Sequence, residues 1–335
     1  MLDRSMRRPG ATLLALALAV GACDGGQDSL APTDSETAAT PAGAPAGEAA
    51  DTAASGPTAA LVTSQRIVFS STRTGQFDLF KADPQGGNTV RLTSAKASDT
   101  EPAWSFDNKR IALVRPRPDG NGATHNDIYI INADGSNGHW ARSKANSSEL
   151  SHPRWSPDGS RLVLTMSIGS DDYVAYLNLA TGQLSAYSTG YGGLPGMYPS
   201  YTSAGQIVYV GPTGGTIIRM NADGSNRKTL LTSTERLADP ALSPDGKKLA
   251  YAVETSWITF THAIRVRNLA TGVTTQLSKS LSSDRQPSWS PDGSRIAFSS
   301  LRSTKTQIWT MSATGGTPTR VTNSDGNEFD PSWSH

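Results

Sequence analysis

The chain has 335 residues, enough for one large domain with appendages. Its formal net charge is +1 and no long basic or acidic run appears, which argues against nucleic-acid binding through an electrostatic surface. It holds one cysteine, Cys23, so an internal disulfide is excluded.

Residues 1–22 have the layout of a secretory signal peptide. Arg4, Arg7 and Arg8 precede an apolar run at residues 11–20, and that run is too short for a bilayer span of about twenty residues. The Val-Gly-Ala-Cys sequence at residues 20–23 resembles a bacterial lipobox, in which the cysteine receives lipid and becomes the mature N-terminus. We therefore expect a lipid anchor on Cys23. The alternative is an ordinary signal peptide followed by a chance cysteine.

Residues 23–63 follow as a segment rich in Ala, Thr, Pro and Gly, with no aromatic residue. Such a composition buries too little apolar surface to offset the entropy of ordering the chain. We expect a disordered tether after the lipidated cysteine, holding a folded domain at residues 64–335 near a membrane.

The folded part is built from repeats of one unit. Three copies of the turn sequence Ser-Pro-Asp-Gly lie at residues 156–159, 243–246 and 290–293, each between two short strand patterns. Six residues occupy the same place in successive repeats, at the end of the first strand pattern. They are spaced about 41 to 51 residues apart, the length of a four-stranded propeller blade. These positions are Trp104, Trp155, Tyr201, Leu242, Trp289 and Trp333. Packing between neighbouring blades is the expected role of the repeated tryptophans.

The two ends of the repeat region complement each other. The first repeat, at residues 65–69, lacks a first strand, while the last residues, 329–335, form a first strand with nothing after it. We therefore predict an all-β fold: a six-bladed β-propeller of four-stranded antiparallel blades, closed when the C-terminal strand completes the first blade.

The Pro-x-Trp-Ser-Pro-Asp-Gly motif with a following Ile-Ala-Phe, as at residues 287–298, resembles the TolB-type WD-like propeller family. The resemblance covers about residues 64–335 and implies a bacterial envelope propeller that binds proteins or other envelope components. TolB itself has a folded α/β domain ahead of its propeller, where this chain has a lipobox and a tether. The resemblance therefore does not imply that this chain interacts with the Tol machinery.

In a four-stranded blade, the first-to-second and third-to-fourth turns lie on one face, here called the turn face. The second-to-third loops and the crossings between blades lie on the other, here called the loop face. Length variation is concentrated on the loop face, where function usually resides. We predict partner-binding loops there, carrying Tyr191, Met197, Trp257 and Phe260; the alternative is that these side chains only pack their own loops.

A second candidate site is the residue before each strand-opening proline. Six equivalent positions are expected to form a ring at the mouth of the central channel: Glu101, His152, Tyr198, Asp239, Gln286 and Asp330. The three carboxylates Glu101, Asp239 and Asp330 are a candidate ligand set for a hard cation such as Ca²⁺. The alternative is that they cap strand ends or are hydrated, and no cofactor is otherwise expected.

No Gly-x-Ser-x-Gly nucleophile motif occurs, and the five histidines lack close metal-ligand spacing. These are His125, His139, His152, His262 and His335. We expect a non-catalytic, monomeric binding protein with envelope-protein partners, on the periplasmic side of a membrane. The alternative is a polysaccharide lyase, hydrolase or glycan receptor acting at the central channel, with His125, His152 and His262 on one face.

Overall fold

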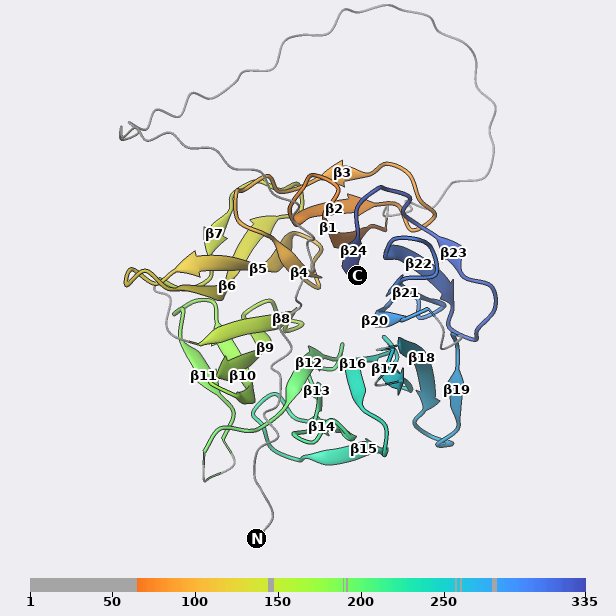
Figure 1. Ribbon diagram of the computed structural model, residues 1–335. Helices are drawn as coiled ribbons and strands as arrows, with labels where there is room; N and C mark the ends of the chain where they lie inside the picture. Colours follow the sequence, from red (N-terminus) through yellow and green to blue (C-terminus); the bar gives the residue numbers. More distant parts are fainter. Residues whose placement is uncertain are drawn as a thin grey trace, which may run out of the picture. The chain divides into compact units, whose positions relative to one another are not determined.

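The computed structural model describes residues 65–143, 148–188, 190, 192–256, 258–259, 261–278 and 282–335. The segments predicted to be a signal peptide and a tether, with Cys23 between them, lie outside the described residues. Twenty-four strands form six separate four-stranded antiparallel sheets arranged around a central axis (Figure 1). The six-bladed propeller predicted from the repeats is therefore confirmed. No helix long and apolar enough to cross a membrane occurs in the part of the chain that the structure describes.

Each blade contributes one strand at each of four distances from the axis. The inner strands of blades 1 to 6 are β24 (Glu328–Trp333), β4 (Thr100–Trp104), β8 (Glu149–Trp155), β12 (Met197–Tyr201), β16 (Leu237–Leu242) and β20 (Arg285–Trp289). The second strands are β1 (Ile67–Ser71), β5 (Arg110–Pro118), β9 (Arg161–Ile168), β13 (Ile207–Val210), β17 (Lys248–Ser256) and β21 (Arg295–Ser300). The third strands are β2 (Asp78–Ala82), β6 (Thr124–Asn132), β10 (Asp171–Asn178), β14 (Thr216–Met220), β18 (Thr261–Asn268) and β22 (Gln307–Ser312). The outer strands are β3 (Val90–Arg91), β7 (His139–Trp140), β11 (Leu184–Ala186), β15 (Lys228–Thr232), β19 (Thr274–Gln276) and β23 (Thr319–Arg320).

The ring closes where the two ends of the repeat region meet. Strand β24 pairs with β1 in the order β24-β1-β2-β3, with Ile67 opposite Trp333 and Ser71 opposite Glu328. Arg66 extends this pairing, because its carbonyl accepts the backbone N–H of Ser334 at 2.8 Å. The expected closure of blade 1 by the C-terminal strand is confirmed, and it leaves β1 with a partner on both sides.

The Ser-Pro-Asp-Gly turns are held by their own side chains. In blade 3 the hydroxyl of Ser156 donates to Asp158 Oδ1 at 2.6 Å, and the N–H of Gly159 donates to the Ser156 carbonyl at 2.9 Å. Gly159 has φ of +68°, a conformation that glycine adopts without steric cost. The aspartate therefore serves the turn, which fixes the geometry of the turn face.

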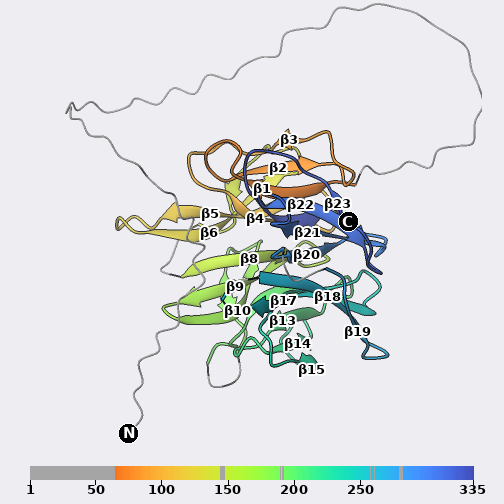
Figure 2. The ribbon, with the colours of Figure 1, turned by 45° about the vertical axis from the view of Figure 1, so that its right-hand side comes forward.

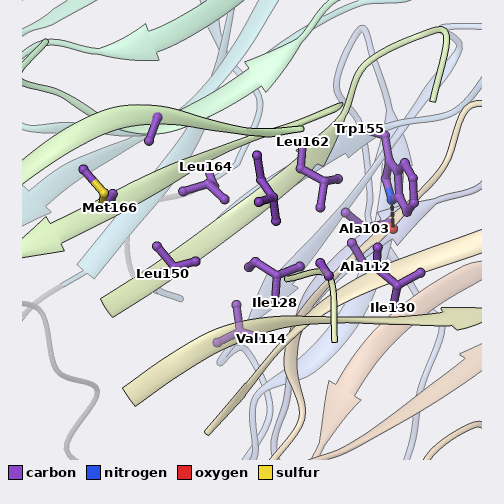
Figure 3. Packing of buried hydrophobic residues seen from close by; sticks show 13 residues of the cluster. Ala103, Ala112, Val114, Ile128, Ile130, Leu150, Trp155, Leu162, Leu164 and Met166 are labelled. Atoms are coloured by element: carbon purple, nitrogen blue, oxygen red, sulfur yellow. Dashed lines mark hydrogen bonds between the residues drawn. The ribbon is translucent and has the colours of Figure 1, made fainter. Parts of the chain in front are cut away.

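Apolar side chains fill the spaces between blades. Figure 3 shows one such cluster between blades 2 and 3, where Ile128, Leu150 and Leu162 are fully buried. Trp155 belongs to this cluster, and its indole N–H donates to the carbonyl of Ala103 in the preceding blade at 3.0 Å. Trp289 makes the same bond to Ala241 at 3.0 Å. Trp155 and Trp289 thus join neighbouring blades through both packing and a hydrogen bond.

Long hairpins project from several blades. In Figures 1 and 2 the β5–β6 hairpin extends beyond its neighbours, in keeping with the nine residues of each of its strands. These hairpins end on the loop face, so the scaffold is regular on one face and variable on the other.

Candidate functional site

The six ring residues share one unusual backbone conformation. Each is the second to fourth residue of its inner strand, near the loop face, and each precedes a proline. Their φ values are +52° for Glu101, +54° for His152, +54° for Tyr198, +50° for Asp239, +57° for Gln286 and +55° for Asp330. A β-bulge interrupts the inner-strand pairing at each position. Proline cannot donate to a sheet ladder, so a bulge is the expected local solution.

A left-handed backbone costs a non-glycine residue about 1–2 kcal/mol. All six positions nevertheless carry a side chain. Each of the six residues thus combines this backbone conformation with a polar side chain, which glycine would lack. Clusters of such residues are typical of sites where geometry matters more than local stability.

Hydrogen bonds join these residues from blade to blade in a head-to-tail order. Asp330 Oδ2 accepts the backbone N–H of Glu101 at 3.3 Å. The Glu101 carboxylate in turn accepts the backbone N–H of His152, and His152 Nε2 lies 3.8 Å from Glu101 Oε1. Each side chain thus satisfies the main chain of the next blade.

The same order continues on the other side of the channel. Asp239 Oδ2 accepts the backbone N–H of Gln286 at 3.3 Å. Gln286 Oε1 accepts the backbone N–H of Asp330 at 3.1 Å, and Gln286 Nε2 donates to Asp330 Oδ1. Asp330 also accepts from the Ser70 hydroxyl at 3.1 Å.

Tyr198 breaks this pattern. Its backbone N–H donates to Thr165 Oγ1 at 3.1 Å, and its ring packs edge-on against His152 with centroids 4.5 Å apart. Among the described residues, no hydrogen bond joins Tyr198 to Asp239 in the next blade. Among the described residues the hydrogen-bonded ring therefore has two gaps, between blades 3 and 4, where His152 and Tyr198 only pack together, and between blades 4 and 5.

Burial sets the charge of the ring. Loss of solvation raises the pKa of Asp330, and the nearby Glu101 carboxylate raises it further, to about 7. Burial also raises the pKa of Glu101 and of Asp239. It lowers the pKa of His152 and raises that of the Tyr198 phenol. The channel interior thus favours neutral forms of these groups.

The candidate Ca²⁺ ligands stand in different parts of the ring. Glu101 and Asp330 lie in adjacent blades, whereas Asp239 belongs to blade 5. Within the described residues, no group of three or more His, Cys, Asp or Glu side chains is placed to hold a metal ion.

On the loop face, buried carboxylates of three blades bind arginines. In blade 2, Arg115 makes a bidentate pair with Asp99, with N···O distances of 2.6 and 2.8 Å. In blade 6, Arg302 pairs with Asp284 at 2.8 Å, and in blade 1, Arg73 pairs with Glu328. The three carboxylates have no exposed side-chain area. Each arginine also stacks on aromatic rings of its blade, as Arg115 does on Tyr129 at 3.9 Å.

Exposed aliphatic side chains mark the same face. Ile168 ends β9, Ile258 lies in the β17–β18 loop, and Leu301 follows β21, so all three lie at second-to-third loops. Their exposed fractions are 51%, 70% and 51%. Of the predicted partner-binding residues, Met197 is half-buried against the cluster between blades 4 and 5. Tyr191, Trp257 and Phe260 lie outside the described residues.

The five histidines have separate surroundings. His125 Nδ1 lies 2.8 Å from Glu149 Oε1, while His139 is exposed and His262 is buried. His335 stacks on Phe106 with ring centroids 4.1 Å apart, and burial lowers its pKa to about 4. His152 belongs to the ring, so these histidines do not form one cluster.

Sequence reasoning missed Arg154, which lies in the central channel. It follows Pro153 on β8 and lines both a narrow space beside the ring and a cavity of about 130 Å³ toward the turn face. A signal for it was present: the five equivalent positions hold small residues, Ala103, Ser200, Ala241, Ser288 and Ser332.

Comparison with known proteins agrees with this architecture. The PD40 family, described as the TolB beta propeller domain, matches residues 62–215 and 204–335. The Tol-Pal system protein TolB of Anaeromyxobacter dehalogenans (strain 2CP-C) is 29% identical over 128 residues, covering 35% of this chain and 26% of that protein. The uncharacterized peptidase YuxL of Bacillus subtilis (strain 168) is 27% identical over 175 residues, covering 50% of this chain and 23% of that protein. The chain thus spans about a quarter of the length of these curated relatives.

Two solved structures are similar in fold. TolB from Acinetobacter baumannii superposes with a TM-score of 0.67 at 22% identity, covering 80% of this chain and 66% of that one. An oligogalacturonate lyase in complex with manganese has a TM-score of 0.51 at 16% identity, covering 78% of this chain and 74% of that one. At these identities the likeness concerns the propeller fold alone.

Proposed function

The chain belongs to the TolB β-propeller domain family, and from that premise we propose that it is a non-catalytic scaffold that binds other proteins of the cell envelope. The matched relatives include a Tol-Pal system protein and a peptidase, so membership alone does not select the activity. The choice rests on the surface of the propeller.

One observation carries the proposal. Ile168, Ile258 and Leu301 expose half or more of their surface on the loop face, at the second-to-third connections of blades 3, 5 and 6. A partner protein that covered these side chains would remove their apolar surface from water, which favours association. In blade 6 the buried Asp284–Arg302 pair holds the loop that carries Leu301, and a loop that is ordered in advance loses less entropy on binding.

We also propose that the propeller is held at a membrane through lipid on Cys23, on the periplasmic side. The lipobox-like residues 20–23 and the polar composition of residues 23–63 support this location. A tether of forty flexible residues has a root-mean-square span of about 35 Å, which leaves the loop face free to turn toward a partner.

Affinity capture from solubilised envelope tests the scaffold role. The bait is the protein itself, compared with a triple variant carrying Ile168→Asp, Ile258→Asp and Leu301→Asp. The control is Val273→Asp, which adds the same charge at an aliphatic residue that is 61% exposed beside the β18–β19 turn on the turn face. We expect an envelope protein that is retained by the control and lost with the triple variant. Equal capture by all three baits would contradict the proposal.

The absence of catalysis is a separate proposal with its own test. The protein is incubated with oligogalacturonate and manganese, and with peptide substrates, and the products are followed by ultraviolet absorbance and mass spectrometry. We expect no turnover above that of a heat-denatured sample. Reproducible turnover that disappears when His152 is changed to Ala would favour the enzyme alternative.

A further inference from the structure

The central channel widens into a cavity of about 130 Å³ on the turn-face side of the ring. Its wall comes from the ends of all six inner strands, and it reaches the turns at Ser203, Pro244 and Pro291. Tryptophans from four blades line it: Trp104, Trp155, Trp289 and Trp333. An apolar cavity of about 150 Å³ holds one benzene molecule. This cavity therefore has room for one small ring or a branched aliphatic group.

Arg154 is the one charged side chain among the described residues that line this cavity. His335 is the other ionisable lining residue, and its ring stacks on Phe106 with centroids 4.1 Å apart. No aspartate or glutamate of the described chain lines the cavity. The pocket therefore carries a positive charge and aromatic walls.

The Arg154 guanidinium is not neutralised within the part of the chain described. Nη1 donates to the carbonyl of Pro153 at 2.8 Å, but no described carboxylate lies within 4 Å of it. Glu101 and Asp239 attract it from a greater distance. The buried Asp99–Arg115 pair on the loop face shows how this protein neutralises an arginine when the role is structural. Arg154 differs in lacking such a bidentate carboxylate partner among the described residues, and it lines both this cavity and the narrow space beside the ring.

Other lining groups are also donors. The Ser332 oxygen accepts the backbone N–H of Trp104 at 3.1 Å, and the Ser288 oxygen accepts that of Trp333 at 2.9 Å. Each of these hydroxyls keeps its own O–H available to donate. The indole N–H of Trp104 is buried and has no hydrogen-bond partner among the described residues. A ligand that matches this wall must supply acceptors.

We propose that this cavity binds a small organic carboxylate, whose oxygens pair with Arg154 and accept from Ser288 and Ser332 while its apolar body packs among the tryptophans. Guanidinium–carboxylate bonds are among the strongest polar contacts, especially away from bulk water. The site goes beyond the scaffold role and does not rest on it, because the scaffold surface lies on the opposite face. The shared chemistry is a carboxylate on a benzene-sized body, either a free acid or the last residue of a polypeptide.

Benzoate is the probe for the free acid, and benzamide of the same shape is its uncharged control. Binding is followed by isothermal titration and by intrinsic fluorescence, since four tryptophans line the cavity. For the polypeptide source, a tetrapeptide ending in phenylalanine is compared with its C-terminal amide. We expect the carboxylate of at least one pair to bind tenfold or more tightly than its amide.

Variants place the binding at this cavity. Arg154→Gln is expected to weaken carboxylate binding tenfold or more, and Arg154→Lys, which keeps the charge, to retain part of it. Arg285→Gln is the matched control, because Arg285 begins the inner strand of blade 6 but does not line the cavity. If Arg154→Gln does not fold, the proposal is tested by comparing the affinities of benzoate and benzamide for the unmodified protein. Equal binding of acid and amide, or no saturable binding of any probe, overturns the proposal.

Discussion

The carboxylate of Asp330 accepts the backbone N–H of Glu101, a residue 229 positions earlier in the chain, at 3.3 Å. The bond spans the junction between the blade that closes the ring and the blade that follows it. The Glu101 carboxylate likewise accepts the backbone N–H of His152 in the next blade. Such bonds join the pre-proline residues at four of the six junctions between blades, so these residues should affect the stability of the whole propeller.

Replacing Glu101 by Ala should destabilise the protein by about 1–3 kcal/mol, because the N–H of His152 loses its buried acceptor. Glu101→Gln is the matched control: it keeps an acceptor oxygen and removes repulsion with Asp330, so its free energy of unfolding should equal or exceed that of the wild type. Urea unfolding followed by tryptophan fluorescence measures both. Equal destabilisation by Ala and Gln would show that charge, not the acceptor, is what His152 requires.

The ring should also make stability depend on pH. Asp330 has a pKa raised to about 7 from an ordinary value of 3.8, by burial and by Glu101, while His152 lowers it. The folded state thus binds this proton more tightly than the unfolded state. Its contribution to stability is full below about pH 4 and is lost as the pH rises through about 7.

Asp330→Asn tests this dependence, since Asn cannot ionise. The free energy of unfolding of the variant minus that of the wild type should increase from pH 4 to pH 7 and then level off. Asp292→Asn is a control of opposite sign, because the Ser290 hydroxyl lowers the pKa of Asp292. Its wild-type contribution is lost as the pH falls below about 4. A flat Asp330→Asn difference over this range would refute the assignment.

Removal of residues 330–335 should abolish the single cooperative unfolding transition. Strand β1 would lose its partner and leave an unpaired edge inside the ring. Scanning calorimetry measures the effect. His335→Ala is the control, because it removes only the stack on Phe106 and should cost about 1 kcal/mol. Unchanged melting of the truncated chain would mean that the ring does not need its closing strand.

Arg115→Met should cost about 3–5 kcal/mol, since it leaves the buried Asp99 carboxylate without a counter-ion. Adding Asp99→Asn should recover part of that loss, because both charges are then gone. Arg236→Met is the control: Arg236 is 77% exposed and lies 3.8 Å from Glu254, so its loss should cost about 1 kcal/mol or less. A double-mutant cycle in urea gives the coupling energy. Strict additivity of the two substitutions in blade 2 would contradict this account.

Cys23→Ser should release the protein from the membrane fraction if lipid on Cys23 is the anchor. Mass spectrometry of the wild-type N-terminus checks the modification, and fractionation of the envelope checks the location. Asp24→Ala is the control, because it changes the neighbouring residue and keeps the thiol that would carry the lipid. This control should stay with a membrane. Membrane retention of Cys23→Ser would exclude the lipid anchor.

The sequence was sufficient for the architecture because each blade repeats its own local signals. The Ser-Pro-Asp-Gly turns and the strands after them reveal the blades one at a time, and the unpaired strand patterns at the two ends imply closure. The equivalence of Glu101 and Asp330 was likewise visible from their place before proline. A proline within a strand pattern also indicates a bulge.

Contacts between blades could not be derived in the same way. The hydrogen bond from Glu101 to Asp330 depends on how two blades meet, and no local pattern encodes that. Two signals were nevertheless available: Arg154 departs from a column of small residues, and acidic residues stand two positions before the ring in three repeats, at Asp99, Asp284 and Glu328. Two of their arginine partners, Arg73 and Arg302, follow the second strand, whereas Arg115 lies within the longer second strand β5.

The closing of blade 1 by β24 also sets the order of events during biosynthesis. Ser71 and its partner Glu328 are separated by 257 residues. At about 5–20 residues per second, the ribosome needs roughly 13–50 seconds to make the intervening chain. Through that interval β1 has no inner partner, and its apolar residues, buried in the finished ring, need shielding by chaperones or by delayed folding. Of the propeller's strands, the one translated last is therefore the one that commits the ring to its folded state.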